Sequence, residues 1–128
     1  MRIFTDQKGR QFLQDADGAI RSMTGVSSPI ATYSADFTLQ ESDSGKFIIL
    51  DTTSGNINVT IPPDASVAWY LFVQIMFFQR GGNTVTFVAG SGVSVESFNS
   101  LLALAGAGAG ASLTRIGTDS WTLIGNLA

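Results

Sequence analysis

One run of residues, from Trp69 to Gln79, is apolar at both alternating sets of positions. Nine of its eleven residues are apolar, and most are aromatic or β-branched types that suit a pleated strand. At a period of two, one face carries Leu71, Val73, Ile75 and Phe77, and the other carries Tyr70, Phe72, Gln74, Met76 and Phe78. A helix is the competing interpretation, but Gly81 and Gly82 end the run and strand-like segments come after them. The pattern predicts a central strand that needs a cover on each face.

Short apolar or alternating segments recur along the rest of the chain at roughly ten-residue spacing, separated by Gly, Pro, Asn and Asp. We expect strands at 37–40, 46–52, 56–61, 84–89, 93–98, 112–116 and 121–124. Arg80 to Asn83 is expected to form a hairpin turn. No segment keeps a helical period. The sequence therefore predicts an all-β fold, either an antiparallel β-sandwich or a barrel.

The first 35 residues differ in character from the rest of the chain. Arg2 to Thr5 and Gln11 to Gln14 are strand-like pieces around a turn, and a second turn leads to a short segment at 19–23. Since this stretch has few large apolar residues, we expect an extended N-terminal arm lying along the body or a neighbour. Residues 24–34 are expected to be a linker. The predicted organisation is an arm and linker over 1–35 and one β domain over 36–128.

Composition adds a reason to expect a covered surface. Of the 128 residues, 45% are hydrophobic and 13% are charged, about half the usual charged fraction. So few charges suggest that part of the surface is not solvated. The net charge of −3 gives no reason to expect nucleic-acid binding. We expect no membrane partner, because the longest apolar run is shorter than the ~20 residues of a spanning helix and no segment resembles a signal peptide.

The chain contains no His and no Cys, which removes the commonest general base and transition-metal ligand and the thiolate nucleophile. Lys8 or Lys46 could serve a Ser nucleophile, but both lie beside Gly in turns. The segment from Asp15 to Gly18 resembles the opening of a calcium loop and lacks the later ligands. The carboxylates weighed for acid–base work lie nearly all in turns or at strand ends: Asp43, Asp51, Asp64, Glu96 and Asp119. We predict no enzyme, no cofactor and no metal site.

Three further features have alternative interpretations. Trp69, Tyr70 and Trp121 could form a platform for sugars or bases, although core or interface packing is favoured. Arg80 ends the doubly apolar strand and is expected at its rim, either beside an acidic neighbour or simply solvated. The Ala/Gly run at 105–111 suits a strand or loop where two backbones pass closely, although Ala alone favours helix.

The order of short motifs over residues 37–128 resembles a β-rich domain of bacteriophage virion proteins, including tail-fibre and capsid-decoration polypeptides. The collinear residues are Phe37-Thr-Leu39, Asp43-Ser-Gly-Lys46, Val59-Thr-Ile-Pro-Pro63, Ser66-Val-Ala68, Val85-Thr86, Ala89-Gly-Ser-Gly-Val93, Gly108-Ala-Gly-Ala-Ser-Leu113 and Ile116-Gly-Thr-Asp-Ser-Trp-Thr-Leu-Ile-Gly125. The resemblance implies an attachment or coat module without catalysis, usually carried in trimers. The strand at 69–78 departs from the milder, more alternating strand that the family has there.

The leading hypothesis is a capsid decoration (cement) protein of a phage virion. Homotrimers on the capsid surface would contact the major capsid protein, or another virion protein, and stabilise the head lattice. The predicted interface between copies is Tyr70, Phe72, Met76, Phe78 and Arg80, or the opposite row of the strand. The predicted contacts of the arm with the lattice are Arg2, Phe4, Lys8, Arg10, Phe12 and Arg21.

Two other hypotheses come from different classes. A tail-fibre or receptor- and glycan-binding module of the phage tail would need an exposed patch of aromatic and polar side chains. A small glycan hydrolase would need two carboxylates facing one cleft. The hydrolase is the weakest of the three, because the chain has no His.

Overall fold

The computed structural model describes residues 2–5, 11–14, 20–22 and 29–128, with the backbone alone for the first three segments. Those segments are β1 (Arg2–Thr5), β2 (Gln11–Gln14) and β3 (Ile20–Ser22), which pair antiparallel in that order. The strands predicted at 2–5 and 11–14 are therefore confirmed. The side chains of the predicted lattice contacts lie outside the described residues: Arg2, Phe4, Lys8, Arg10, Phe12 and Arg21.

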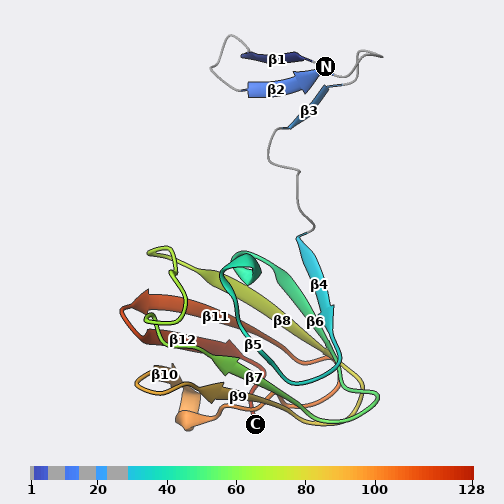
Figure 1. Ribbon diagram of the computed structural model, residues 1–128. Coiled ribbons are helices and arrows are strands. Elements are labelled where there is room, and N and C mark those ends of the chain that lie inside the picture. Colours follow the sequence, from blue (N-terminus) through green and yellow to red (C-terminus); the bar gives the residue numbers. More distant parts are fainter. Residues whose placement is uncertain (1, 6–10, 15–19, 23–28) are drawn as a thin grey trace.

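Residues 29–128 form two β-sheets around a shared hydrophobic core (Figure 1). One sheet has six strands in the order β10-β12-β11-β8-β6-β4, and the other has three in the order β5-β7-β9. The strands are β4 (Ile30–Tyr33), β5 (Phe37–Thr38), β6 (Phe47–Asp51), β7 (Ile57–Ile61), β8 (Gln74–Arg80), β9 (Val85–Ala89), β10 (Ser94–Ser97), β11 (Gly110–Gly117) and β12 (Ser120–Gly125). The helices of this part are two short 3₁₀ turns, η1 (Glu41–Asp43) and η2 (Phe98–Ser100). The all-β prediction is confirmed.

Successive strands from β4 to β10 alternate between the two sheets (Figure 1). As a result β4, β6 and β8 pair parallel in the six-stranded sheet, and β5, β7 and β9 pair parallel in the other. The antiparallel pairs of residues 29–128 are β11 with β12 and β11 with β8. The predicted antiparallel arrangement is therefore wrong for most pairs of the body, and neither sheet closes into a barrel. Residues 80–83 cross between the sheets, so the predicted hairpin is also wrong.

Buried polar groups build the crossover that comes after β8. Thr52 and Gln79 are fully buried, and Asn83 Nδ2 donates a hydrogen bond of 2.6 Å to the Thr52 carbonyl oxygen. Gln79 Nε2 donates to the carbonyl oxygens of Gly81 and Asn83. Gly81 has a φ of +90°, and a Cβ there would lie 2.8 Å from Thr52 Oγ1. Because no larger residue fits and the backbone groups find side-chain partners, the chain can turn sharply from one sheet to the other.

The core lies between the sheets and is made of alternate residues from their facing sides. Phe77 of β8 meets Phe87 of β9 edge to face, with ring centroids 5.0 Å apart, a geometry worth roughly 0.5–1.5 kcal/mol beyond the buried area. The sequence pattern left open which row of the apolar strand faces the core, and the structure buries the row of Val73, Ile75 and Phe77. The buried apolar residues are Leu39, Ile48, Leu50, Ile57, Val59, Ile61, Val73, Ile75, Phe77, Val85, Phe87, Leu104, Ala109, Ala111, Leu113, Trp121 and Leu123.

Residues 30–33, predicted as part of the linker, form the edge strand β4 and pair parallel with β6. The Tyr33 ring stacks on Phe37 with centroids 3.8 Å apart, and its hydroxyl donates to Asp43 Oδ1 at 2.8 Å. Burial, together with the neighbouring Asp43 carboxylate, raises the pKa of Tyr33 to about 12. The linker prediction is wrong at these residues because contacts distant in sequence, and not local turn chemistry, hold the strand.

The Ala/Gly run leads into β11 and passes close to two neighbouring backbones. A Cβ at Gly110 would lie 3.2 Å from the Phe77 carbonyl oxygen, and one at Gly125 would lie 2.6 Å from Ala111 Cα. We expect Gly125→Ala to lower the free energy of unfolding, measured by urea denaturation, by about 2–4 kcal/mol through overpacking and backbone strain.

Gly106→Ala is the matched control for Gly125→Ala. Gly106 has a φ of +149°, close to the +158° of Gly125, but a Cβ there would meet nothing within 4 Å. Gly106→Ala therefore introduces the backbone strain without the steric clash, and it should lower the free energy of unfolding by less than Gly125→Ala. Equal losses in the two variants would contradict the role of close backbone packing.

A second prediction concerns Tyr33 at alkaline pH. The pKa of about 12 in the folded chain lies above the ordinary 10.0, so the stability linked to the neutral phenol is full below pH 10. It is lost as the pH rises from 10 towards 12. The difference in unfolding free energy between wild type and Tyr33→Phe should shrink over this interval in urea titrations. A constant difference between pH 10 and 12 would contradict the assignment.

Candidate interaction surface

β8 lies inside the six-stranded sheet, between β11 and β6, and its side chains alternate between the core and the opposite face. We call the face turned away from the three-stranded sheet the outer face. Gln74, Met76 and Arg80 are exposed there and Phe78 is half-buried. The core thus covers one face of the apolar strand, and nothing in the described part of the chain covers the other.

Strand register places apolar side chains of neighbouring strands next to one another on the outer face. Ile30 is the register partner of Phe47, and Phe47 is the partner of Met76. The same row continues across the sheet: Met76 is the register partner of Ser112 on β11, and Ser112 is the partner of Ile124 on β12. Ile49 and Phe78 are partners in the next row. We call this set the outer patch: Ile30, Phe47, Ile49, Met76, Phe78 and Ile124.

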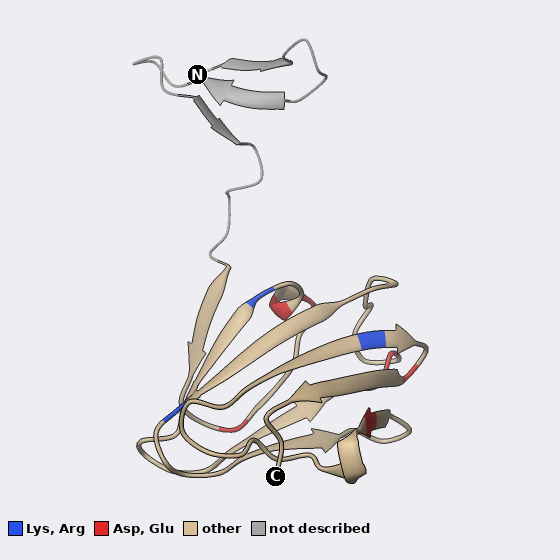
Figure 2. Cartoon of the chain, turned by 180° about the vertical axis from the view of Figure 1, so that it is seen from behind, with Lys and Arg blue, Asp and Glu red and all other residues tan. Residues whose placement is uncertain are grey.

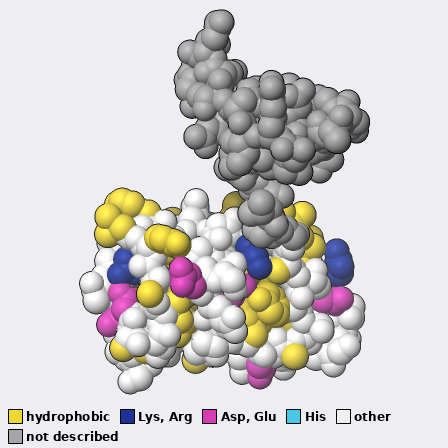
Figure 3. Space-filling view, turned by 45° about the horizontal axis from the view of Figure 1, so that its top comes forward, with side chains coloured by type: hydrophobic (Ala, Val, Ile, Leu, Met, Phe, Trp, Pro, Cys, Tyr) yellow, Lys and Arg dark blue, Asp and Glu magenta, His cyan; other side chains and the backbone are white. Residues whose placement is uncertain are grey.

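The six strands carry few charged residues: Asp51, Arg80, Glu96 and Arg115. Asp51 and Arg80 form the row next to Ile49 and Phe78, at the end of the outer patch, and Arg115 faces the core. Figure 2 shows charged positions mainly in the loops and near strand ends, and Figure 3 shows groups of hydrophobic side chains with charges around them. Arg80 is exposed at the end of β8, as predicted, and is the register partner of Asp51. Hydrogen bonds from Thr53, and secondarily the Arg80 charge, lower the pKa of Asp51. An apolar centre inside a polar rim is the arrangement found in protein–protein interfaces.

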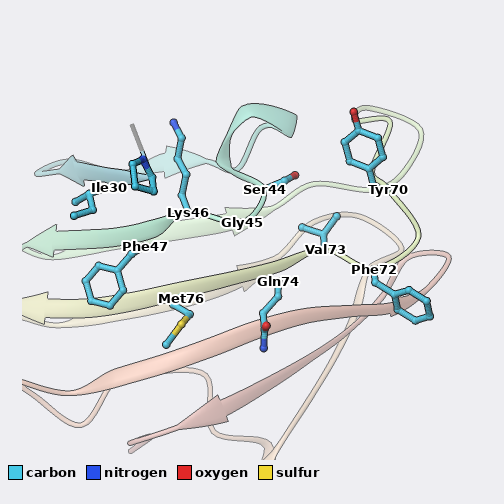
Figure 4. A pocket seen from close by; sticks show the side chains of 11 residues that line it. Ile30, Ser44, Gly45, Lys46, Phe47, Tyr70, Phe72, Val73, Gln74 and Met76 are labelled. Carbon is cyan, nitrogen blue, oxygen red and sulfur yellow. The ribbon is translucent and has the colours of Figure 1, made fainter. Parts of the chain in front are cut away.

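Two depressions flank the ridge formed by Phe47 and Met76. The larger has a volume of about 770 Å³ and extends to Tyr70 and Phe72 (Figure 4). The smaller, of about 410 Å³, lies on the side of Ile124. Figure 4 shows Phe47 and Met76 side by side on adjacent strands, with Tyr70 and Phe72 at the other end. The outer face therefore has a projecting pair of side chains and two depressions, each large enough to admit side chains of a partner.

The loop before β8 differs from the prediction. We expected Trp69 to Val73 to be part of the central strand, but β8 begins at Gln74. Leu71, which the pattern placed in the same row as Val73 and Ile75, is exposed, as are Tyr70 and Phe72, the last at 79%. The carbonyl oxygens of Tyr70 and Leu71 accept hydrogen bonds from Arg115 Nη1 at 3.3 and 3.2 Å. These carbonyls are bonded by a side chain instead of a neighbouring strand, which explains why the strand starts later.

Arg115 itself is a buried residue that the prediction missed. It lies on the inward face of β11, and its Nη2 is 2.5 Å from Asp64 Oδ2. The Arg115 guanidinium, which donates to Asp64, holds the pKa of that carboxyl below its usual value of 3.8. The Asp64 backbone N–H donates to Asp119 Oδ1 at 2.7 Å. The sequence did contain a signal for this burial. Alternation places Arg115 on the same strand face as Leu113, and a charge on a buried face requires a buried partner.

The other residues considered for a functional role, Asp43 and the two tryptophans, take part in hydrogen bonding and packing within the fold. Asp43 is buried and accepts hydrogen bonds from the Tyr33 hydroxyl and the Gln40 N–H. Trp121 is fully buried and meets Trp69 edge to face, with centroids 5.2 Å apart. Packing, the favoured interpretation of the two tryptophans, is therefore confirmed, and Tyr70 alone of the proposed platform is exposed.

The described residues contain neither a metal-binding cluster nor a helix that could span a membrane. These residues place no group of three or more His, Cys, Asp or Glu side chains where they could hold a metal ion. None of the helices in the described part is long and apolar enough to cross a membrane. Lys8 and the turn from Asp15 to Gly18, weighed as a nucleophile partner and a calcium loop, lie outside the described residues.

Comparison of the chain with protein-family models, with curated proteins and with solved structures found no match.

The Asp64–Arg115 pair gives a prediction at acidic pH. Because the pKa of Asp64 is lowered in the folded chain, its contribution to stability is present above pH 3.8 and is lost as the pH falls below that value. The stability difference between wild type and Asp64→Asn should therefore shrink on acidification below pH 3.8. Urea denaturation at a series of pH values measures it, and a difference that does not change would contradict the ion pair.

Proposed function

We propose that this chain is a structural protein of a phage virion that associates with copies of itself through the outer patch. In this proposal the two sheets form a β-sandwich, and three copies assemble into a capsid decoration trimer that stabilises the head lattice. The observation that carries the proposal is the exposure of the outer patch in the single chain, with Met76 at 50% at its centre. Removing such a surface from water is a direct source of association free energy.

The size of the outer face suits a specific interface. The strands from β12 to β4 are spaced ~4.8 Å apart and residues rise ~3.3 Å, which gives a projected area of roughly 500 Å² over the length of β8. Side-chain relief makes the accessible area larger. The projected area alone is already more than half of the ~800 Å² that each partner contributes to a standard interface.

A second copy of the chain is the occupant that fits the shape and charge. The Phe47–Met76 ridge lies between two hollows, so the ridge of one copy can enter a hollow of another. The net charge of −3 is small enough that repulsion between copies is weak. The low charged fraction of 13% is also what a surface covered in the assembly requires.

The placement on a phage particle is supported by the resemblance of residues 37–128 to virion domains. In this proposal the other partner is the major capsid protein or a neighbouring virion protein, contacted through the N-terminal arm. The bridging contacts would stabilise the head only while the trimers are bound.

A tail-fibre or glycan-binding module is the second candidate, favoured by one observation. Tyr70 is exposed beside the larger depression, which Gln74 and Lys46 also line, and an aromatic face with nearby polar groups suits a sugar ring. Fractionation of particles separates the candidates: decoration places the chain with heads in many copies, and a fibre places it with tails in few.

The self-association prediction is tested with Met76→Lys. Because Met76 is already half exposed, the single chain should still fold, but an unpaired charge would be buried in the interface. We expect the dissociation constant, measured by sedimentation equilibrium, to rise by at least about 100-fold. Val88→Lys is the control, because Val88 is an exposed apolar residue of β9 in the other sheet.

Two results would contradict the proposal. One is a wild-type chain that stays monomeric at concentrations well above the micromolar range. The other is equal weakening by Met76→Lys and Val88→Lys, which would show that the outer patch has no special part in association.

A further inference from the structure

The loop between β7 and β8 carries two of the most exposed aromatic side chains of the described residues, Tyr70 and Phe72. Both line the larger depression, at the end away from the Phe47–Met76 ridge. They extend the outer patch beyond the sheet, although they do not belong to any strand. Their position depends on what holds the loop.

One guanidinium group links both ends of this loop to β11. Arg115 Nη2 contacts Asp64 Oδ2 at 2.5 Å, near the start of the loop. Arg115 Nη1 donates to the carbonyl oxygens of Tyr70 and Leu71, near its end. Arg115 is buried and belongs to a strand paired on both sides, so it provides a rigid anchor for the loop.

We propose that Arg115 is a positioning residue for association, which holds the loop so that Tyr70 and Phe72 complete the interface between copies. The inference rests on the proposed self-association through the outer patch. A loop already held in its bound position loses little conformational entropy when a partner arrives, so pre-organisation strengthens binding without adding a contact. Arg115 would thus control affinity from a position that touches no partner.

The guanidinium geometry makes this role specific to arginine. Its two terminal nitrogens bond the carboxylate and the two carbonyl oxygens at the same time, because the planar fork presents donors in fixed directions. A lysine could keep the ion pair but has one compact ammonium group. We therefore expect Arg115→Lys to restore part of what Arg115→Met removes.

The first measurement compares wild type with Arg115→Met. We expect a dissociation constant raised about tenfold or more in sedimentation equilibrium, with cooperative unfolding retained. Trp69 lies in the loop and Trp121 is fully buried, so acrylamide quenching of tryptophan fluorescence reports on the loop. Quenching should increase in Arg115→Met and return partly towards wild type in Arg115→Lys.

A double-variant cycle separates positioning from general destabilisation. If Arg115 acts through the loop side chains, Phe72→Ser should weaken association in wild type and add little in the Arg115→Met background. If Arg115 only stabilises the fold, the two effects add. Phe98→Ser is the matched control, because Phe98 is exposed at 76% against 79% for Phe72 but lies in η2.

Each outcome decides the inference. Wild-type affinity in folded Arg115→Met, or additive effects in the cycle, would overturn the positioning role and leave the proposed function intact. A monomeric wild type would overturn the proposed function, and the inference with it. If Arg115→Met does not fold, Asp64→Asn replaces it in the same measurements, and wild-type affinity with wild-type quenching in that variant would overturn the role.

Discussion

The central position of β8 is the constraint on which the rest of this structure depends. Its backbone is bonded on one side to β11 and on the other to β6, while its side chains project from both faces. The three-stranded sheet covers one face and supplies Phe87 to meet Phe77. An apolar strand with one cover leaves Met76 and its row neighbours in water, which is unfavourable at roughly 25 cal/mol per Å². The proposed association is a consequence of this imbalance.

The path of the chain explains why the second cover is missing. From β4 to β10 every other strand passes through the three-stranded sheet, on the inner side of β8. The crossovers lie at the strand ends, and Thr52, Gln79 and Asn83 bond the turning backbone after β6 and β8. The covering strands are thus all used on one side, and the alternation that makes neighbours parallel also leaves the outer face open in the described chain. Large parallel sheets usually have both faces covered.

Much of the fold could be predicted from local patterns, whereas the site depends on contacts that those patterns do not contain. Alternation located β7 and separated the two side-chain rows of β8, and turn residues located most strand ends. The pairing could not be read, because Gly81 and Gly82 suit a hairpin and a crossover equally well. Phe47 and Ile49 were not predicted to belong to the interaction surface. The run at 47–50 is nevertheless apolar on both faces, which is the same signal that singled out β8. The role of Arg115 could not be predicted from local patterns, because the groups it bonds lie more than forty residues away in the sequence.

The chemistry of the outer face also indicates how strong the association should be. Obligate interfaces resemble a divided core, but here Gln74, Thr114 and Thr122 form a polar row beside the apolar one. Gln74 Nε2 already donates to Ser112 Oγ at 3.0 Å, so part of this row is satisfied before any partner binds. A surface that mixes polar and apolar rows supports reversible association. The proposed lattice assembly would need this balance, because a subunit with a wholly apolar face would aggregate before it found its partners.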